Sequence, residues 1–184
     1  MYKTVVFDLD GTLLNTLTDL ADAGNRLCRK YGWPTHERQA YRYFLGNGIP
    51  KLVERLAPAD QRTPAVLEAA LADFKRDYGQ HLRDTTAPYP GIPEMLAKLK
   101  ANGVPLAVFS NKADALAKEV VKDYFGTQYF TIVRGQMTGV APKPAAEGTN
   151  ALLQALHADP ASTLYVGDSN VDVETAHNAN LPCC

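Results

Sequence analysis

The stretch Thr4–Leu13, close to the amino terminus, constrains the fold more than any other part of the sequence. Apolar and β-branched residues lead straight into two carboxylates, Asp8 and Asp10, and then Gly11 and Thr12 interrupt the run. This pattern is typical of a buried strand that ends in a tight turn. Because side chains two residues apart on a strand share a face, we expect Asp8 and Asp10 to point the same way where the strand leaves the core.

Two carboxylates in one direction repel each other unless a cation lies between them or one of them holds a proton. A hard cation such as Mg²⁺ takes oxygen ligands and shares them with substrate phosphates, which fits a cluster without neighbouring His or Cys. The alternative is a pair of solvated aspartates in a turn. From this pair of residues alone, both interpretations stay open.

The rest of the chain divides into an all-helical block and a region in which helices and strands alternate. The block is predicted to contain helices over Leu14–Tyr31, His36–Phe44, Ile49–Ala57 and Pro64–His81. After Pro90 we expect helices over Ile92–Asn102, Lys112–Tyr124 and Ala145–Leu156, and strands over Val104–Phe109, Tyr129–Val133 and Thr163–Val166.

Strands separated by helices imply parallel pairing, so the predicted fold class is α/β with a doubly wound parallel sheet. The predicted core comprises residues 1–14 and 85–184, and residues 15–84 form a separate helical lid. Ligands of such a sheet bind beyond the carboxyl ends of its strands.

Composition excludes several classes of function. With 184 residues and a net charge of -1, the chain has no general basic surface, so nucleic acid is not an expected partner. No apolar run approaches the roughly twenty residues of a membrane span, and the amino terminus leads directly into the first strand, so we expect a soluble, cytoplasmic protein without a membrane partner. Three cysteines, two of them adjacent, do not form a disulfide framework. A monomer and a dimer are both compatible with the sequence.

Polar side chains follow the predicted strands at the edge where their carboxyl ends meet. Ser110 and Asn111 follow one strand, Asp168 and Asp172 follow another, and Lys143 precedes a helix. Each residue has an ordinary explanation when taken singly, as a helix cap, a turn residue or a solvated lysine. Together with Asp8 and Asp10 they suit a Mg²⁺ ion and a phosphate group.

The ordered set resembles motifs I to IV of the haloacid dehalogenase-like (HAD) superfamily. The matching residues are Asp8-Leu9-Asp10-Gly11-Thr12, then Ser110, then Lys143-Pro144, and then Gly167-Asp168 with Asp172. The resemblance implies a Rossmann-like core with an inserted α-helical cap domain of the C1 type. It also implies a phosphatase that works through an aspartyl-phosphate intermediate.

The family's roles carry over position by position. Asp8 would be the nucleophile, and Asp10 would protonate the leaving oxygen and later activate water. Phosphate oxygens would be bound by Thr12, Ser110, Asn111 and Lys143. Mg²⁺ would be held by Asp8, the backbone carbonyl of Asp10, and Asp168, with Asp172 in support.

A stretch of the helical block, Leu45–Lys51, suggests the substrate. Two glycines around an asparagine ahead of a helix leave backbone N–H groups able to hold an anion, although a plain turn is the alternative. The stretch resembles that of phosphoglycolate phosphatases, which implies a small phosphorylated acid as the substrate. Its carboxylate would contact Gly46, Asn47, Gly48 and Lys51.

Other functions fit the same motifs. A phosphonoacetaldehyde hydrolase would use Lys51 to form a Schiff base, a phosphosugar mutase would return the phosphoryl group to the sugar, and a non-catalytic module would use the scaffold only for binding. The chain stops after a predicted helix, at Leu181–Cys184, where the family would supply another strand. We therefore expect a truncated carboxyl end that lacks this strand.

Overall fold

A four-stranded parallel sheet forms the centre of the computed structural model, which describes residues 2–184. Its strands are β1 (Thr4–Phe7), β4 (Leu106–Ala113), β5 (Ile132–Gln136) and β6 (Thr163–Val166), in the order β5-β4-β1-β6. Val6 at the centre of β1 lies opposite Ala107 of β4 and Tyr165 of β6. The four residues of β1 are all buried, which explains why an uninterrupted apolar run precedes Asp8.

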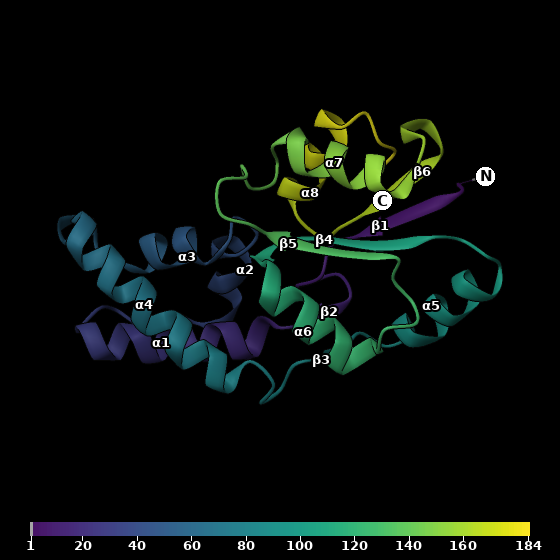
Figure 1. Cartoon of the computed structure of the whole chain (residues 1–184). Coiled ribbons are helices and arrows are strands. Elements are labelled where there is room, and N and C mark those ends of the chain that lie inside the picture. The colour runs from purple at the N-terminus through teal and green to yellow at the C-terminus, as the bar shows by residue number, and fades with distance from the viewer. Residues whose placement is uncertain (1) are drawn as a thin grey trace. The chain divides into compact units, whose positions relative to one another are not determined.

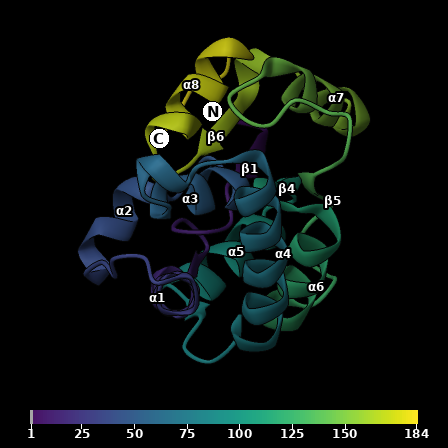
Figure 2. The ribbon, with the colours of Figure 1, turned by 90° about the vertical axis from the view of Figure 1, so that its left-hand side faces the viewer.

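Helices cover both faces of this sheet (Figure 1 and Figure 2). One face carries α5 (Ile92–Ala101) and α6 (Asp114–Phe125), and the other carries α7 (Ala146–Leu156) and α8 (Asn170–Asn178). A buried apolar cluster joins the sheet to α7 and α8 and includes Val6, Phe109 and Leu152. The predicted doubly wound α/β fold is therefore confirmed.

The carboxyl-terminal residues pair with the edge of the sheet. The Tyr165 N–H donates to the Pro182 carbonyl at 2.9 Å, the Cys184 N–H donates to the Tyr165 carbonyl at 2.9 Å, and the Gly167 N–H donates to the Cys184 carbonyl at 3.1 Å. Cys183 forms a parallel bridge with Tyr165. Among the described residues no strand follows α8, as expected, but this short segment satisfies backbone groups on the outer edge of β6.

The chain separates into two compact units. One holds the chain up to Leu14 together with Pro88–Cys184, and the other is Asn15–Ala87. The second unit contains α1 (Leu17–Tyr31), α2 (Tyr41–Phe44), α3 (Ile49–Leu56) and α4 (Pro64–His81), with short 3₁₀ turns at Arg38–Ala40 and Ala59–Gln61. Within it α1 packs along α4, and α3 also packs against α4. Two short strands, β2 (Leu14–Asn15) and β3 (Ala87–Pro88), pair where the chain passes between the units.

Several predicted boundaries are wrong. The first helix begins at Leu17 instead of Leu14, because Leu14 and Asn15 form β2. The strand expected to end at Phe109 continues to Ala113, and the helix expected from Lys112 begins at Asp114. A register shift between Phe109 and Ala113 lets β4 keep its pairing with β5 beyond the apolar run.

Two smaller differences concern short elements. The strand predicted over Tyr129–Val133 is found at Ile132–Gln136, and the helix predicted over His36–Phe44 consists of a 3₁₀ turn followed by α2. A further 3₁₀ turn, Pro160–Ser162, precedes β6. None of the helices in residues 2–184 has the length and apolar character that crossing a membrane would require.

Candidate active site

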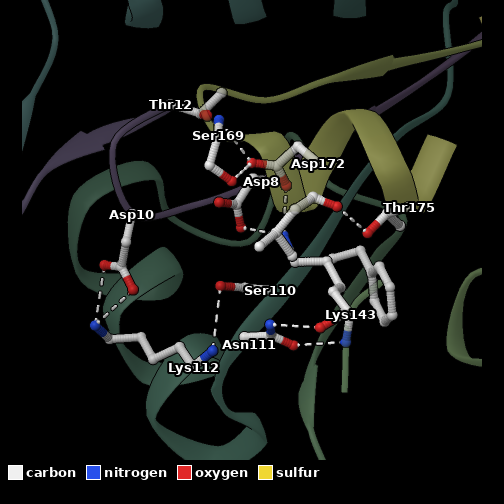
Figure 3. Close-up of polar contacts among 12 residues, drawn as sticks. Asp8, Asp10, Thr12, Ser110, Asn111, Lys112, Lys143, Ser169, Asp172 and Thr175 are labelled. Atoms are coloured by element: carbon white, nitrogen blue, oxygen red, sulfur yellow. Dashed lines mark hydrogen bonds and ion pairs between the residues drawn. The ribbon is translucent and has the colours of Figure 1, made fainter. Parts of the chain in front are cut away.

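A buried lysine between two aspartates forms the centre of the candidate site (Figure 3). The Lys143 ammonium lies 2.9 Å from Asp8 Oδ1 and 2.7 Å from Asp172 Oδ1. The exposed fractions of these side chains are 2% for Lys143, 11% for Asp8 and 1% for Asp172. Asp8 follows β1 and Asp172 lies in the first turn of α8, so sheet and helix bring the three charges together.

Tyr165 and Ser169 complete the environment of Asp172. The Tyr165 hydroxyl donates to Asp172 Oδ1 at 3.2 Å and accepts from Lys143 Nζ at 3.2 Å. The Ser169 backbone N–H and hydroxyl both donate to Asp172 Oδ2, at 3.1 and 2.6 Å, in a capping box at the start of α8. These contacts fix the Asp172 side chain, so Lys143 has a rigid anionic partner on one side.

Burial and charge shift the pKa values of this group in different directions. Burial raises the pKa of Asp8 to about 6, although the nearby Lys143 ammonium opposes the shift. For Asp172, burial would raise the pKa, but Lys143 and the Ser169 hydrogen bonds outweigh it and the pKa is lowered. Burial would likewise lower the pKa of Lys143, but Asp8, Tyr165 and Asp172 raise it well above its ordinary value. Lys143 is therefore protonated, and Asp8 is ionised at neutral pH.

Asp8, Asp168 and Asp172 fit a divalent cation. Each offers a carboxylate oxygen, and these oxygens lie within 4.8 Å of one another. Burial also raises the pKa of Asp168, partly offset by a hydrogen bond from Thr12. Three hard oxygen donors without His or Cys suit Mg²⁺. The Asp10 carboxylate is not in this group, and the prediction for Asp10 concerned its backbone carbonyl.

Gly11 makes room for Asp168. The backbone φ of Gly11 is +91°, and a Cβ atom at this position would overlap the Asp168 carboxylate. Thr12 is directed to the same carboxylate, since its hydroxyl donates to Asp168 Oδ1 at 2.9 Å. Thr12 was predicted to bind phosphate, and in the structure its hydroxyl positions an acidic residue. Only glycine satisfies both the positive φ and the close approach.

Asn111 fixes the loop that carries Lys143. Its Nδ2 donates to the Lys143 carbonyl at 3.1 Å, and its Oδ1 accepts from the Lys143 N–H at 2.8 Å. Ser110, next to it in β4, accepts a hydrogen bond from the Lys112 N–H at 3.3 Å and is 3% exposed. The structure therefore brings Ser110 and Asn111 to the same sheet edge as Asp8, and the Asn111 side chain holds the backbone of Lys143 in place.

A second buried lysine was missed by the sequence reasoning. Lys112 Nζ lies 3.0 and 3.1 Å from the two carboxylate oxygens of Asp10, and its side chain is 3% exposed. The sequence analysis placed Lys112 at the start of a helix, whereas the structure places it in β4. The available signal was the polar tail Ser110-Asn111-Lys112 of an otherwise apolar strand.

Of the residues predicted to contact substrate from the helical block, Gly46, Asn47 and Gly48 lie just before α3, and Lys51 lies in its first turn. Gly48 is the N-cap residue of α3, and because it has no side chain the cap makes no side-chain hydrogen bond to the helix. Asn47 Oδ1 accepts from Arg55 at 2.8 Å, and Arg55 also donates to the Phe44 carbonyl at 2.7 Å. Lys51 forms an ion pair with Glu54, with 2.8 Å between Nζ and each carboxylate oxygen. Arg55 was not predicted, and it closes this loop.

Comparison with known proteins connects this geometry to a family. Residues 5–184 match the profile of the haloacid dehalogenase-like hydrolases. A protein named phosphoglycolate phosphatase from Thiobacillus denitrificans is 32% identical over 183 residues, which cover 98% of this chain and 81% of the relative. A phosphoglycolate phosphatase from Neisseria meningitidis is 33% identical over 180 residues, covering 96% of this chain and 77% of the relative.

Solved structures show the same fold. The crystal structure of a protein from Lactobacillus delbrueckii superposes on this chain with a TM-score of 0.92 at 28% identity, and the match covers 99% of this chain and 84% of that protein. A structure of a predicted phosphoglycolate phosphatase from Haemophilus somnus superposes with a TM-score of 0.88 at 28% identity, again covering 99% of this chain and 84% of the other. With the motif residues gathered at one sheet edge, these matches show that the chain belongs to the haloacid dehalogenase-like hydrolases.

Proposed function

We propose that this protein is a Mg²⁺-dependent phosphatase that hydrolyses a small phosphorylated acid, 2-phosphoglycolate, through an aspartyl-phosphate intermediate. The observation that carries the proposal is the Asp8 carboxylate, held 2.9 Å from the buried Lys143 ammonium and beside Asp168 and Asp172. The names of the relatives from Thiobacillus denitrificans and Neisseria meningitidis support the choice of substrate.

The charges of the site suit attack by a carboxylate on a phosphate. An anionic nucleophile and a phosphate dianion repel each other, so positive charge must lie between them. Lys143 supplies one such charge at the nucleophile itself. Asp8, Asp168 and the backbone carbonyl of Asp10 would hold Mg²⁺ with Asp172 in support, and the ion, when bound, would neutralise phosphate oxygens. Ser110 would bind a phosphate oxygen.

Two half-reactions follow. In the first, an Asp8 carboxylate oxygen bonds to phosphorus, the bond from phosphorus to the substrate oxygen breaks, and Asp10 gives that oxygen a proton. In the second, a water oxygen bonds to phosphorus while Asp10 accepts a water proton. The bond from phosphorus to Asp8 then breaks, which releases inorganic phosphate, restores the Asp8 carboxylate and leaves Asp10 protonated for the next cycle.

The direct test measures phosphate release from 2-phosphoglycolate and from a panel of generic phosphomonoesters, with and without Mg²⁺. We expect a higher kcat/KM for 2-phosphoglycolate, dependence on the metal, and loss of at least about 10³-fold activity in Asp8→Asn, which lacks the nucleophile. Equal turnover of all esters would contradict the substrate, and activity that survives Asp8→Asn would contradict the nucleophile.

Phosphate release and two further experiments separate the alternatives within the family. A phosphosugar mutase would turn over without releasing phosphate, and a Schiff-base mechanism at Lys51 would be trapped by borohydride with phosphonoacetaldehyde. The predicted role of Gly46, Asn47, Gly48 and Lys51 in binding the substrate carboxylate is tested by Lys51→Ala. We expect this variant to raise the KM for 2-phosphoglycolate and to leave the KM for p-nitrophenyl phosphate unchanged.

A further inference from the structure

Lys112 is a buried cation that the proposed chemistry does not yet use. Lysine is almost never fully buried unless an acidic group pairs with it. Here the partner is Asp10, and the ammonium lies within 3.1 Å of both carboxylate oxygens. The Asp10 side chain keeps 25% of its surface exposed, whereas Lys112 keeps 3%. Lys112 therefore holds the carboxylate from the protein side, and the exposed part remains available to a substrate or to water.

The two buried lysines of the site contact different acids. Lys143 contacts Asp8 and Asp172, and Lys112 contacts Asp10. Asp10 and Lys112 both lie at the carboxyl ends of strands, since Asp10 follows β1 and Lys112 lies near the end of β4. A partly exposed carboxylate without such a partner would sample several rotamers.

We propose that Lys112 is a positioning residue that fixes the Asp10 carboxylate for proton transfer in both half-reactions. This inference rests on the proposed function, in which Asp10 serves the leaving oxygen and then water. Catalysis by a positioned acid or base contributes about 10²–10⁴-fold to a rate, and misplacement of the group forfeits much of it. Lys112 itself need not touch the substrate.

The two half-reactions make the proposal testable with a chromogenic substrate. p-Nitrophenolate leaves without a proton, so formation of the aspartyl phosphate from p-nitrophenyl phosphate does not need Asp10. Hydrolysis of the intermediate does need it, because water must lose a proton. A variant that lacks only the positioning of Asp10 will therefore release one equivalent of p-nitrophenol quickly and then turn over slowly.

The experiment is rapid mixing of Lys112→Met with p-nitrophenyl phosphate and Mg²⁺. We expect a burst of about one p-nitrophenol per active site, followed by a steady-state rate about 10²-fold below that of the unmodified protein. With 2-phosphoglycolate we expect a similar loss in kcat, without a burst, because its alkoxide needs a proton to leave. Lys112→Arg keeps the charge and should recover the steady-state rate to within about tenfold.

Lys118→Met is the matched control. Lys118 also belongs to an ion pair, 2.7 Å from Asp114 in α6, but its side chain is 57% exposed. We expect this variant to show unchanged kinetics with both substrates. Lys112→Gln, which is neutral but polar, repeats the test if Lys112→Met does not fold, and failure of both to fold would overturn the proposal because Lys112 would then serve the fold.

Asp10→Asn distinguishes this inference from the proposed function. If Asp10→Asn gives the burst and slow turnover but a folded Lys112 variant does not, only the role of Lys112 is wrong. If Asp10→Asn turns over p-nitrophenyl phosphate as fast as the unmodified protein and without a burst, the acid and base role of Asp10 is wrong, and the inference about Lys112 fails with it. The proposed phosphatase activity itself is tested separately by Asp8→Asn. A Lys112→Met variant that slows the burst and the steady state equally, or that stays within about threefold of the unmodified protein, also overturns the inference.

Discussion

Replacing Lys143 with Met should destabilise the protein through the two carboxylates that it leaves behind. Asp8 and Asp172 would then face each other with oxygens less than 4.8 Å apart. At that separation two unit charges repel by about 3 kcal/mol for an effective dielectric constant of about 20. Breaking a buried ion pair by removing one partner costs about 3–5 kcal/mol in measured cases, which agrees with this figure. For a chain of this size we expect the Tm to fall by about 6–20 °C.

A second substitution isolates the charge effect. Asp172→Asn in the Lys143→Met background removes one of the two like charges and should restore about 1–3 kcal/mol, although Asp172→Asn alone is destabilising. Thermal and urea unfolding followed by circular dichroism, without added divalent cation, measure all four proteins of the cycle. Neither Lys143→Met nor the double variant should be active, because both lack the ammonium group beside the nucleophile.

The surface pair of Lys118 provides the reference for this cycle. Lys118→Met breaks an exposed ion pair and should change the free energy of unfolding by less than about 1 kcal/mol. The electrostatic reasoning is refuted if Lys143→Met is no less stable than Lys118→Met. It is also refuted if the two substitutions at Lys143 and Asp172 are additive.

Three further predictions concern other contacts. Gly11→Ala should lower kcat at least about 100-fold in a folded protein, since a Cβ would displace the carboxylate of Asp168, and kinetics with a thermal melt check it. Burial would raise the pKa of Asp19, but hydrogen bonds from Thr85 and Thr86 outweigh burial and lower this pKa in the folded protein. The ionised Asp19 therefore stabilises the fold at pH values above its pKa in the unfolded chain, and this contribution is lost as the pH falls through its pKa in the folded protein. Asp19→Asn should therefore cost about 1–3 kcal/mol at pH 7 and progressively less below about pH 4, and a cost independent of pH would contradict this. Arg55→Met should loosen the loop before α3 and raise the KM for 2-phosphoglycolate about tenfold with little change in kcat, and an unchanged KM would count against a substrate role for that loop.

The sequence predicted what depends on local pattern. The apolar run before Asp8 indicated a buried strand, and alternation of strands and helices after Pro90 implied parallel pairing; the structure confirms both. Because the carboxyl ends of parallel strands meet at one edge, the convergence of Asp8, Lys143 and Asp168 followed without knowledge of any contact. All four residues of β1 are more than 90% buried, which reflects the same cause.

What the sequence did not predict depends on tertiary contacts. A lysine after an apolar strand ordinarily begins a solvated helix, and only the continued pairing of β4 with β5 places Lys112 in a buried position. Asp19 fitted the first turn of a helix, where an acidic residue is favourable for local reasons. Its hydrogen bonds to Thr85 and Thr86 join positions 66 and 67 residues away, which no local pattern encodes.

The balance of charge explains why these residues belong together. In the part of the chain that the structure describes, the site brings together four carboxylates and two buried ammonium groups, so the fully ionised group carries two excess negative charges. The carboxylates are those of Asp8, Asp10, Asp168 and Asp172, and the ammonium groups are those of Lys112 and Lys143. The raised pKa values of Asp8 and Asp168 have burial as their largest cause, and neighbouring carboxylates add to it. A divalent cation would neutralise this excess charge. Lys112 would still contact Asp10, and Lys143 would still contact Asp8. The nucleophile and the acid therefore have separate cationic partners, so a defect in one pair need not disturb the other.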